Sequence, residues 1–425
     1  MSHPALHLRL RLWAIGYALA SICGAASAQT AVTPHCGMDS RTKAVGEPIS
    51  LGAVVGKTGP DDFSGSADAA MAYFRCVNDN GGIHGRPIQY FVMDDQWSPE
   101  TAIQAASTLL QDRKVLALVG STSFVECSAN AQRYAESGAM VVVGTGVPRD
   151  CFHAKNYVPV NSGPRVSSTI ASMFMVQKYQ AKSVVCIIPN VPGLVDWACH
   201  GAQQWGARHK VKVTIVPIDP GSFDASKVMQ SVAQTQPDVI VMNLPKGILI
   251  PMMAASAKLD LGKSIRFASS APAYNTDVAK ALGPYWKDRF WVNLEFQPID
   301  LVAPDMQNWR AVLDRYGPRG HSLDAFSQGG YLAARMVTQV LLTMEPANLD
   351  RARLSEALRK VTDFQSDILC KAFYVGGGKR HNANSSGPMA VYTGTGWLLA
   401  SASCISADDP ELVDMRAEER KLKIH

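Results

Sequence analysis

The segment from Asn78 to Asp95 constrains the fold more than any other part of this chain. Its sequence is Asn-Asp-Asn-Gly-Gly-Ile-His-Gly-Arg-Pro-Ile-Gln-Tyr-Phe-Val-Met-Asp-Asp. Its three glycines can adopt the positive φ that ends a helix and reverses the chain. Pro87 fixes the approach to a short apolar run, residues 88–93, which is typical of a buried strand. The pattern predicts a helix, a tight turn and a strand of an α/β domain.

An acidic pair, Asp94 and Asp95, ends this strand. Adjacent strand residues point to opposite faces, so the two carboxylates are not expected to share a catalytic or metal site. We expect them to have a structural role instead, such as accepting hydrogen bonds from amides of nearby loops.

Strand and helix patterns alternate along most of the chain. Strands are expected at residues 49–55, 88–93, 115–119, 140–143, 183–188, 211–217, 239–242, 265–268 and 290–294. Helices are expected at residues 65–78, from 98, and at 127–137, 166–179, 194–207, 225–235 and 248–259. This βαβ rhythm predicts parallel sheets with helices on both faces. Two successive units of this kind predict an α/β chain with two doubly wound, Rossmann-like lobes.

The pattern changes after about residue 297. Helices are expected at residues 304–316, 323–343 and 350–360, followed by short strands at 371–375, 388–392 and 396–402. The last residues, 408–425, are highly charged and are expected to form a solvated tail or a helix.

The first residues have the form of a secretory signal. Two arginines precede an uncharged run at residues 12–23, and Ala-Ser-Ala at 26–28 has the form of a cleavage site. We expect residues 1–28 to be a signal peptide, and the mature chain to begin near Gln29 and to be periplasmic. An uncleaved anchor is the alternative. The residues before Cys23 fit a lipoprotein box poorly.

Composition indicates an ordinary globular protein. The 425 residues are 47% hydrophobic and 18% charged, which suits a large core and favours two domains over one. The net charge of +5 falls to +3 without the two arginines of the expected signal peptide. This weak, scattered charge excludes nucleic acid as an expected partner.

Eight of the nine cysteines lie beyond the expected signal peptide, an even number that suits disulfides in an oxidising compartment. Eight cysteines allow 105 connectivities. Short loops favour Cys127–Cys151 and Cys186–Cys199, and Cys36–Cys76 and Cys370–Cys404 would follow. A buried free thiol is the alternative for Cys186. No cysteine or histidine spacing suits a metal, so none is expected.

The sequence motifs that we considered for catalysis and cofactor binding are incomplete or absent in this chain. Residues 52–58 resemble a phosphate loop, but they have three residues between the glycines where four are needed. No Gly-x-Gly-x-x-Gly follows the first strand and no Gly-x-Ser-x-Gly is present. We therefore expect a protein that binds a ligand, without a cofactor and without enzymatic activity.

Five segments together resemble the solute-binding proteins of branched-chain amino acid type ABC transporters. They are Leu51-Gly-Ala-Val-Val, residues 78–95, Val119-Gly-Ser-Thr-Ser, Pro237-Asp-Val-Ile and Asp324-Ala-Phe-Ser-Gln-Gly-Gly-Tyr. The resemblance extends over about residues 48–403. It implies a type I periplasmic-binding fold, in which the chain crosses three times between two lobes that close on a solute. It also implies delivery to an inner-membrane ABC permease, and we expect the protein to act as a monomer.

On this resemblance, residues 47–160 and 297–369 form lobe 1, residues 161–296 and 370–407 form lobe 2, and residues 408–425 form a charged tail. The ligand would lie at the carboxyl ends of the parallel strands, where loops and helix N-termini present free amides.

Ligand-binding residues are expected in the loops that the resemblance aligns with this cleft. Ser121, Thr122, Ser123 and Thr145 would hold a carboxylate, with a cap or turn role as an equally open alternative for each hydroxyl. Phe63, Phe124, Trp197 and Tyr274 would form apolar walls, with burial in the core as the stronger alternative. Gly144, Asn243 and Ser270 complete the expected set.

One departure from the family bears on the solute. Amino acid binders of this family hold the ammonium with an acidic residue of lobe 2, whereas residues 269–274 here contain none. A buried ammonium without a carboxylate partner would be costly. We therefore expect an aromatic or aliphatic carboxylate, with an amino acid still possible. Two other functions stay open, a ligand-sensing subunit of the same fold that signals to a membrane partner, and an exported enzyme with an unfamiliar site.

Overall fold

The computed structural model describes Met1, residues 32–376 and residues 384–424. Apart from Met1, the expected signal peptide and the start of the mature chain near Gln29 lie outside the described residues. Residues Thr33–His425 belong to one compact unit.

The first sheet is parallel throughout and has the strand order β2-β1-β3-β4-β5. Its strands are β1 (Ile49–Val55), β2 (Ile88–Asp94), β3 (Ala117–Ser121), β4 (Met140–Val143) and β5 (Tyr157–Pro159). β3 begins two residues later than expected, because a π-helical turn (Thr108–Asp112) precedes it and the amide of Val115 donates to the carbonyl of Leu109. β5 was not predicted.

The second sheet has the order β13-β12-β10-β9-β8-β6-β7. Its parallel strands are β6 (Ser183–Pro189), β7 (Lys212–Ile218), β8 (Val239–Met242), β9 (Arg266–Ser269) and β10 (Phe290–Asn293). The antiparallel strands β12 (Met389–Tyr392) and β13 (Trp397–Leu399) extend one edge. Its parallel part, β7-β6-β8-β9-β10, repeats the order of the first sheet. A short pair, β11 (Ser386–Gly387) and β14 (Ile405–Ser406), lies outside both sheets.

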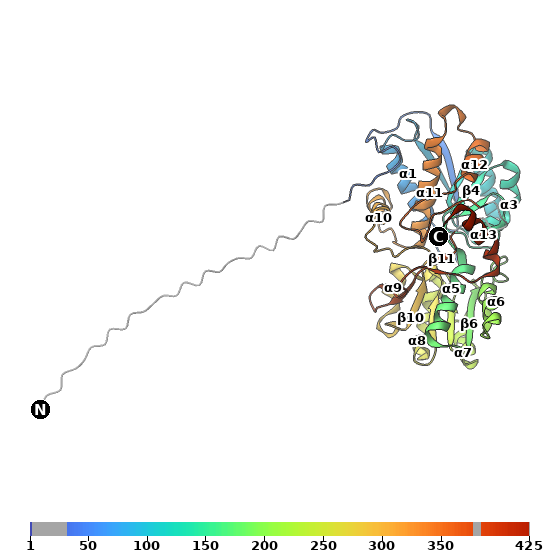
Figure 1. The fold of residues 1–425 in the computed structure, drawn as a ribbon, viewed down its shortest axis with the longest axis vertical. Helices are drawn as coiled ribbons and strands as arrows, with labels where there is room; N and C mark the ends of the chain where they lie inside the picture. Colours follow the sequence, from blue (N-terminus) through green and yellow to red (C-terminus); the bar gives the residue numbers. More distant parts are fainter. Residues whose placement is uncertain (2–31, 377–383, 425) are drawn as a thin grey trace. The chain divides into compact units, whose positions relative to one another are not determined.

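Helices join and cover the strands (Figure 1). They are α1 (Gly65–Asp79), α2 (Pro99–Ser107), α3 (Glu126–Ser137), α4 (Asp150–His153), α5 (Gly163–Tyr179), α6 (His200–Arg208), α7 (Ala225–Gln234), α8 (Lys246–Lys258), α9 (Thr276–Leu282), α10 (Pro304–Tyr316), α11 (Ala325–Thr343), α12 (Arg351–Arg359) and α13 (Val413–Leu422). The predicted two-lobe α/β architecture is confirmed, and the lobe boundaries themselves stay a prediction.

Two predicted elements are wrong in detail. The helix expected from residue 194 begins only at His200, because Pro192 and Gly193, the latter at φ +73°, hold the chain in turns. The strand expected at residues 371–375 is absent: Phe373 forms only an isolated bridge with Phe364. Its apolar side chains are buried, but no strand among the described residues extends the pairing.

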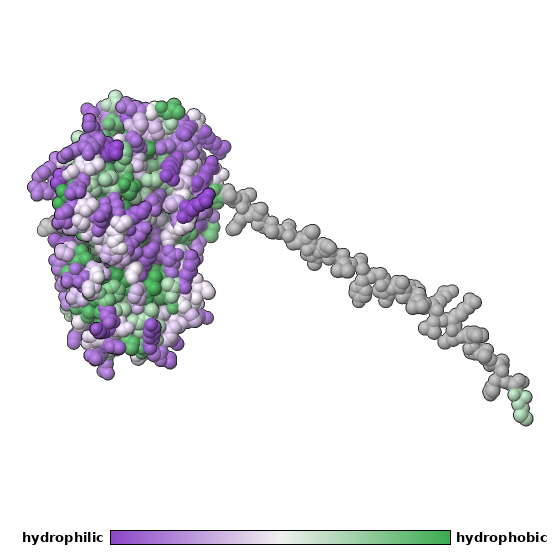
Figure 2. All heavy atoms as spheres, turned by 180° about the vertical axis from the view of Figure 1, so that it is seen from behind, coloured by the Kyte–Doolittle hydropathy of each residue, from purple (hydrophilic) through white to green (hydrophobic). Residues whose placement is uncertain are grey.

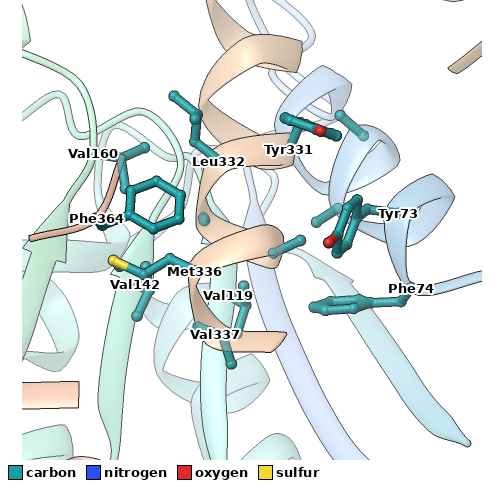
Figure 3. Packing of buried hydrophobic residues seen from close by; sticks show 14 of the residues in the cluster. Tyr73, Phe74, Val119, Val142, Val160, Tyr331, Leu332, Met336, Val337 and Phe364 are labelled. Atoms are coloured by element: carbon teal, nitrogen blue, oxygen red, sulfur yellow. The ribbon is translucent and has the colours of Figure 1, made fainter. Parts of the chain in front are cut away.

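Helix α11 packs on the first sheet although it comes late in the chain (Figure 3). Its side chains Tyr331, Leu332, Met336 and Val337 share one core with Val119 and Val142 of that sheet. In Figure 1 the orange α11 lies beside the blue α1. Their contact requires glycine, because a Cβ on Gly330 would lie 1.8 Å from the Ser66 carbonyl oxygen. The chain therefore leaves the second sheet after β10 and returns to it at β12.

Four disulfides join Cys36 to Cys76, Cys127 to Cys151, Cys186 to Cys199 and Cys370 to Cys404. These are the four pairs that the sequence favoured. The alternative of a free thiol at Cys186 is wrong.

The C-terminal residues form a helix, α13, that is anchored to the rest of the chain. Leu412 and Met415 are buried in the core beside α5. Arg165 of α5 donates from Nε and Nη2 to the two carboxylate oxygens of Asp409, at 2.7 and 2.9 Å, with both side chains buried. The expectation of a helix in residues 408–425 is confirmed by α13, Val413–Leu422. The described residues of this segment do not form a free solvated tail.

A buried acid lies at the start of α3. Glu126 is 1% exposed, and the Tyr157 hydroxyl donates to its Oε1 at 3.3 Å. Burial raises the pKa of Glu126 to about 8, against an ordinary value of 4.5. The folded protein therefore holds this group protonated at neutral pH.

The surface drawn in Figure 2 is mostly hydrophilic, with small hydrophobic areas between. Among the helices of the described part of the chain, none combines the length and the apolarity that a bilayer crossing needs.

The buried Arg165–Asp409 pair gives a first prediction. Asp409→Asn removes the bidentate counter-charge of the buried guanidinium and leaves it with the partly exposed Glu411, whose Oε1 lies 3.5 Å from Nη1. We therefore expect a loss of about 3 kcal/mol in the free energy of unfolding. Asp408→Asn is the matched control. Asp408 pairs with Arg208 at 3.1 Å on the surface, where an ion pair contributes about 0–1 kcal/mol. Urea unfolding of both variants without reductant measures the difference, and equal losses would contradict the assigned role.

Glu126 gives a second prediction, with its sign fixed by the raised pKa. Between about pH 4.5 and 8 the folded state binds more protons at this group than the unfolded state, so its contribution to stability falls as pH rises. Glu126→Gln mimics the protonated form. We expect the free energy of unfolding of the variant, relative to that of the wild type, to rise by roughly 4 kcal/mol between pH 4.5 and pH 8. Urea unfolding at both pH values measures this gain, and a difference that does not change with pH would refute the assignment.

Candidate functional site

A pocket lies where the carboxyl ends of the two sheets meet. Its empty volume is about 420 Å³, including space open to solvent. The residues that line it are Phe63, Phe124, Thr145, Gly146, Val147, Asn161, Pro164, Leu194, Asn243, Leu244, Pro245, Pro272, Glu295 and Phe326. Most of them are apolar.

Equivalent strands of the two sheets supply the lining. In the first lobe it follows β1, β3, β4 and β5, and in the second lobe it follows β6, β8, β9 and β10. These strands hold the same positions in the two sheet orders. Ligands of open α/β sheets bind at this edge, beside the strands where the direction of winding reverses. The repeated topology thus places two such edges around one pocket.

Aromatic rings form one wall. The ring of Phe63 lies 5.1 Å from that of Phe124 and 5.3 Å from that of Phe326, and Trp97 stacks behind Phe63 at 5.3 Å. Phe63 and Phe124 were expected in this place. Phe326 was missed because it belongs to α11, far from the strand-end loops in sequence. Its signal in the sequence was an aromatic residue two positions after Asp324, which caps a late helix.

Three of the expected hydroxyl groups are engaged within the protein. Ser121 Oγ accepts from the Val54 amide at 3.2 Å, and Thr122 Oγ1 donates to the Ser121 carbonyl at 2.8 Å. Ser123 Oγ donates to Asp95 and accepts from the Glu126 amide at 3.0 Å. These contacts fit the alternative role as a cap or turn residue that was left open for each hydroxyl. The three residues are not part of the described lining of the pocket.

Thr145 and Asn243 do line the pocket. Thr145 Oγ1 is buried without a hydrogen-bond partner among the described residues. Asn243 is fixed by two contacts: its Nδ2 donates to the Pro164 carbonyl at 3.1 Å, and its Oδ1 accepts from Ser270 Oγ at 3.0 Å. Ser270 therefore supports the lining from behind.

The other expected residues lie away from this lining. Gly144 packs against α11, and a Cβ there would lie 3.1 Å from the Gly330 nitrogen. The ring of Trp197 lies tilted against that of Phe152, with the ring centroids 5.2 Å apart. The Tyr274 hydroxyl accepts from the Ile299 amide at 3.1 Å. For the two aromatic residues this is the core role of the alternative.

The acidic pair has the structural role that its position predicted. Asp94 Oδ1 accepts from the amides of Lys57 and Gln96 at 2.9 and 3.0 Å. Asp95 Oδ1 accepts from the Trp97 amide at 2.9 Å. Together they fix the two loops behind the aromatic wall.

Glu295 is a second lining residue that was not predicted from the sequence. It is 3% exposed, and its carboxylate accepts from Asn161 Nδ2 at 3.0 Å and from the Gly163 amide at 2.8 Å. On the family resemblance, an acidic residue of the second lobe was expected at residues 269–274, whereas Glu295 follows β10. Its signal was a single charge within the apolar run Phe290-Trp-Val-Asn-Leu-Glu-Phe.

Burial raises the pKa of Glu295 to about 7, and the donors at Asn161, Gly163 and Ser162 limit the rise. In the described lining it is the one ionisable side chain. A group of three His, Cys, Asp or Glu residues that could hold a metal is not found within residues 32–376 and 384–424.

Comparison with known proteins agrees with this geometry. The family described as periplasmic binding protein matches residues 48–396. Among curated proteins, no match to the sequence is found.

Several solved structures share the fold. A fatty acid ABC transporter substrate-binding protein from Thermomonospora curvata is 17% identical, with 87% of this chain and 95% of that chain covered and a TM-score of 0.72. An ABC transporter solute-binding protein from R. palustris in complex with 4-hydroxybenzoate is 16% identical, with 87% and 100% covered and a TM-score of 0.73. A leucine-binding protein from Thermotoga maritima is 16% identical, with 85% and 99% covered and a TM-score of 0.69.

At these identities the likeness concerns the fold, while the family match extends over most of the sequence. The chain therefore belongs to the periplasmic binding protein family, whose members bind solutes and are not enzymes.

Proposed function

We propose that this protein captures a small carboxylic acid with an apolar or aromatic body between its two lobes and delivers it to an ABC permease. The observation that carries the proposal is the aromatic pocket built from equivalent strand ends of both sheets. Pockets of this kind combine apolar walls with a few fixed polar groups.

The polar and apolar parts of the lining suit such a solute. A ring or alkyl chain would pack on Phe63, Phe124 and Phe326. Its carboxylate would accept from the Thr145 hydroxyl, which has no other partner in the described part of the chain. The structurally similar proteins include one described as binding 4-hydroxybenzoate, one described for fatty acids and one for leucine, all of them carboxylic acids.

Contacts across the cleft support capture by closure. The Gly247 amide after β8 donates to Asp61 Oδ2 after β1 at 3.0 Å, and the Arg149 amide donates to the Gly193 carbonyl at 2.7 Å. Each bond joins a segment that follows a strand of one lobe to a segment that follows a strand of the other lobe. A solute enters this pocket when these contacts open, and closure buries the solute against both lobes.

The setting in which the protein works is also part of the proposal. A leader at residues 1–28 would direct the chain to the periplasm, and the four disulfides suit an oxidising compartment. We expect the mature protein to act there as a monomer.

A thermal-shift panel tests the solute class. The panel contains benzoate, 4-hydroxybenzoate, hexanoate and leucine, with neutral sugars as the comparison class. A solute that binds only the folded protein, at about 100 times its Kd, adds about 2.7 kcal/mol of stability. We expect a clear rise in Tm with at least one acid. A response to sugars alone would contradict the proposed class.

A pair of variants tests the pocket. Phe326→Ala removes a ring from the lining, and we expect affinity for the best acid to fall about tenfold or more. Phe223→Ala is the matched control, because Phe223 is also half-buried but packs on the core of the second lobe. Isothermal titration calorimetry gives both Kd values. A larger loss of affinity with Phe223→Ala than with Phe326→Ala would indicate that the binding site lies elsewhere.

A further inference from the structure

Glu295 links the ligand pocket to the chain segments that cross between the lobes. It lies at the second crossing, directly after β10. Its carboxylate accepts from Asn161 and Gly163 of the first crossing, at 3.0 and 2.8 Å. Its backbone carbonyl accepts from Asn384 Nδ2, just before β11, at 2.8 Å. One residue thus contacts all three crossings and also lines the pocket.

Among the residues that the structure describes, the groups that face Glu295 are neutral. Asn161, Ser162 and Gly163 lie before and at the start of α5, and Thr145 follows β4. Asn243 follows β8, and Phe326 belongs to α11. The first amide of the 17-residue helix α5 points at the carboxylate, and a helix N-terminus favours a negative charge. Burial opposes that charge, and with a pKa of about 7 the group exists in both forms near neutral pH.

The carboxylate has unused acceptor capacity. Two carboxylate oxygens offer about four lone-pair sites. Asn161 and Gly163 use one site on each oxygen, and Ser162 adds a third donor. A donor from a bound solute fits the remaining capacity. A second carboxylate at this place would instead put two like charges into an apolar cavity, which is costly.

We propose that Glu295 determines the specificity of the pocket, by selecting carboxylic acids that carry a hydrogen-bond donor, such as a hydroxyl group, at the end distant from their own carboxylate. This inference rests on the proposed function. The solute would lie with its carboxylate near Thr145 and its donor at Glu295, between the two lobes. The same carboxyl group accepts hydrogen bonds from Asn161 and Gly163. The donor of the solute would therefore be bound at the chain segments that cross between the two lobes.

Matched acids that differ only in the donor test the proposal. The pairs are 4-hydroxybenzoate with benzoate and 6-hydroxyhexanoate with hexanoate, titrated by calorimetry into the full mature protein at pH 8. A hydrogen bond to a charged group corresponds to about tenfold or more in affinity, so we expect this preference for the hydroxylated acid in at least one pair. Glu295→Gln should reduce the preference to within about threefold. The matched control Glu136→Gln, at an exposed position, should keep it.

The pH profile of the wild type gives a measurement that needs no variant. Glu295 is ionised above its pKa of about 7, so the preference should be full at pH 8 and should shrink as pH falls to 5.5. This profile stands even when Glu295→Gln fails to fold, which circular dichroism would reveal.

The outcomes separate the two proposals. Equal binding within both pairs, or a preference for the unsubstituted acid, overturns the role of Glu295 and leaves the solute class intact. A preference that persists in folded Glu295→Gln, or that does not change with pH, overturns it as well. Binding of none of the four acids overturns the solute class for these acids, and with it the inference that rests on that class.

Discussion

The hydrogen bonds from Asn161 and Gly163 to Glu295 are the contact on which the rest of this architecture depends. They hold the start of α5, the first helix of the second lobe, against the strand that ends that lobe's parallel series. Asn161 also exchanges two hydrogen bonds with Gly146 after β4, at 2.8 and 3.1 Å. A strand end of the first lobe and a helix start of the second are thereby fixed to one buried carboxyl group. The pocket is the space left around this contact.

Much of the fold could be predicted because local pattern and tertiary structure agree. The segment 78–95 became the end of α1, a turn with three positive-φ glycines and β2, and Ser98 caps α2 with Pro99 at its first position. The misses arise where tertiary context decides. Residues 371–375 have a strand pattern, but within the described part of the chain they lack a neighbouring strand. The segment that leads into α13 is anchored by the buried ion pair of Arg165 and Asp409, whose members are more than 200 residues apart in sequence.

The lining of the pocket was predicted in part from topology, and its role in binding a ligand stays a prediction. Strand-end logic placed Phe63, Phe124, Thr145 and Asn243 in the lining, because every parallel strand ends at the same edge. Residue type could not separate a hydroxyl that faces solute from one that caps a turn, and Ser121 to Ser123 proved to be internal. Glu295 was not predicted because its carboxyl group is positioned by Asn161 and Gly163 of the first crossing between the lobes. A sequence pattern does not reveal such partners.

The order of the disulfides has a consequence for how the chain matures. Beyond residue 32, each cysteine is bonded to its nearest unpaired neighbour in sequence, 36 with 76, 127 with 151, 186 with 199 and 370 with 404. A chain that enters an oxidising compartment from its N-terminus exposes the two members of each pair before the next pair arrives. Oxidation in order of arrival therefore produces the native set among 105 possible sets, without a reshuffling step.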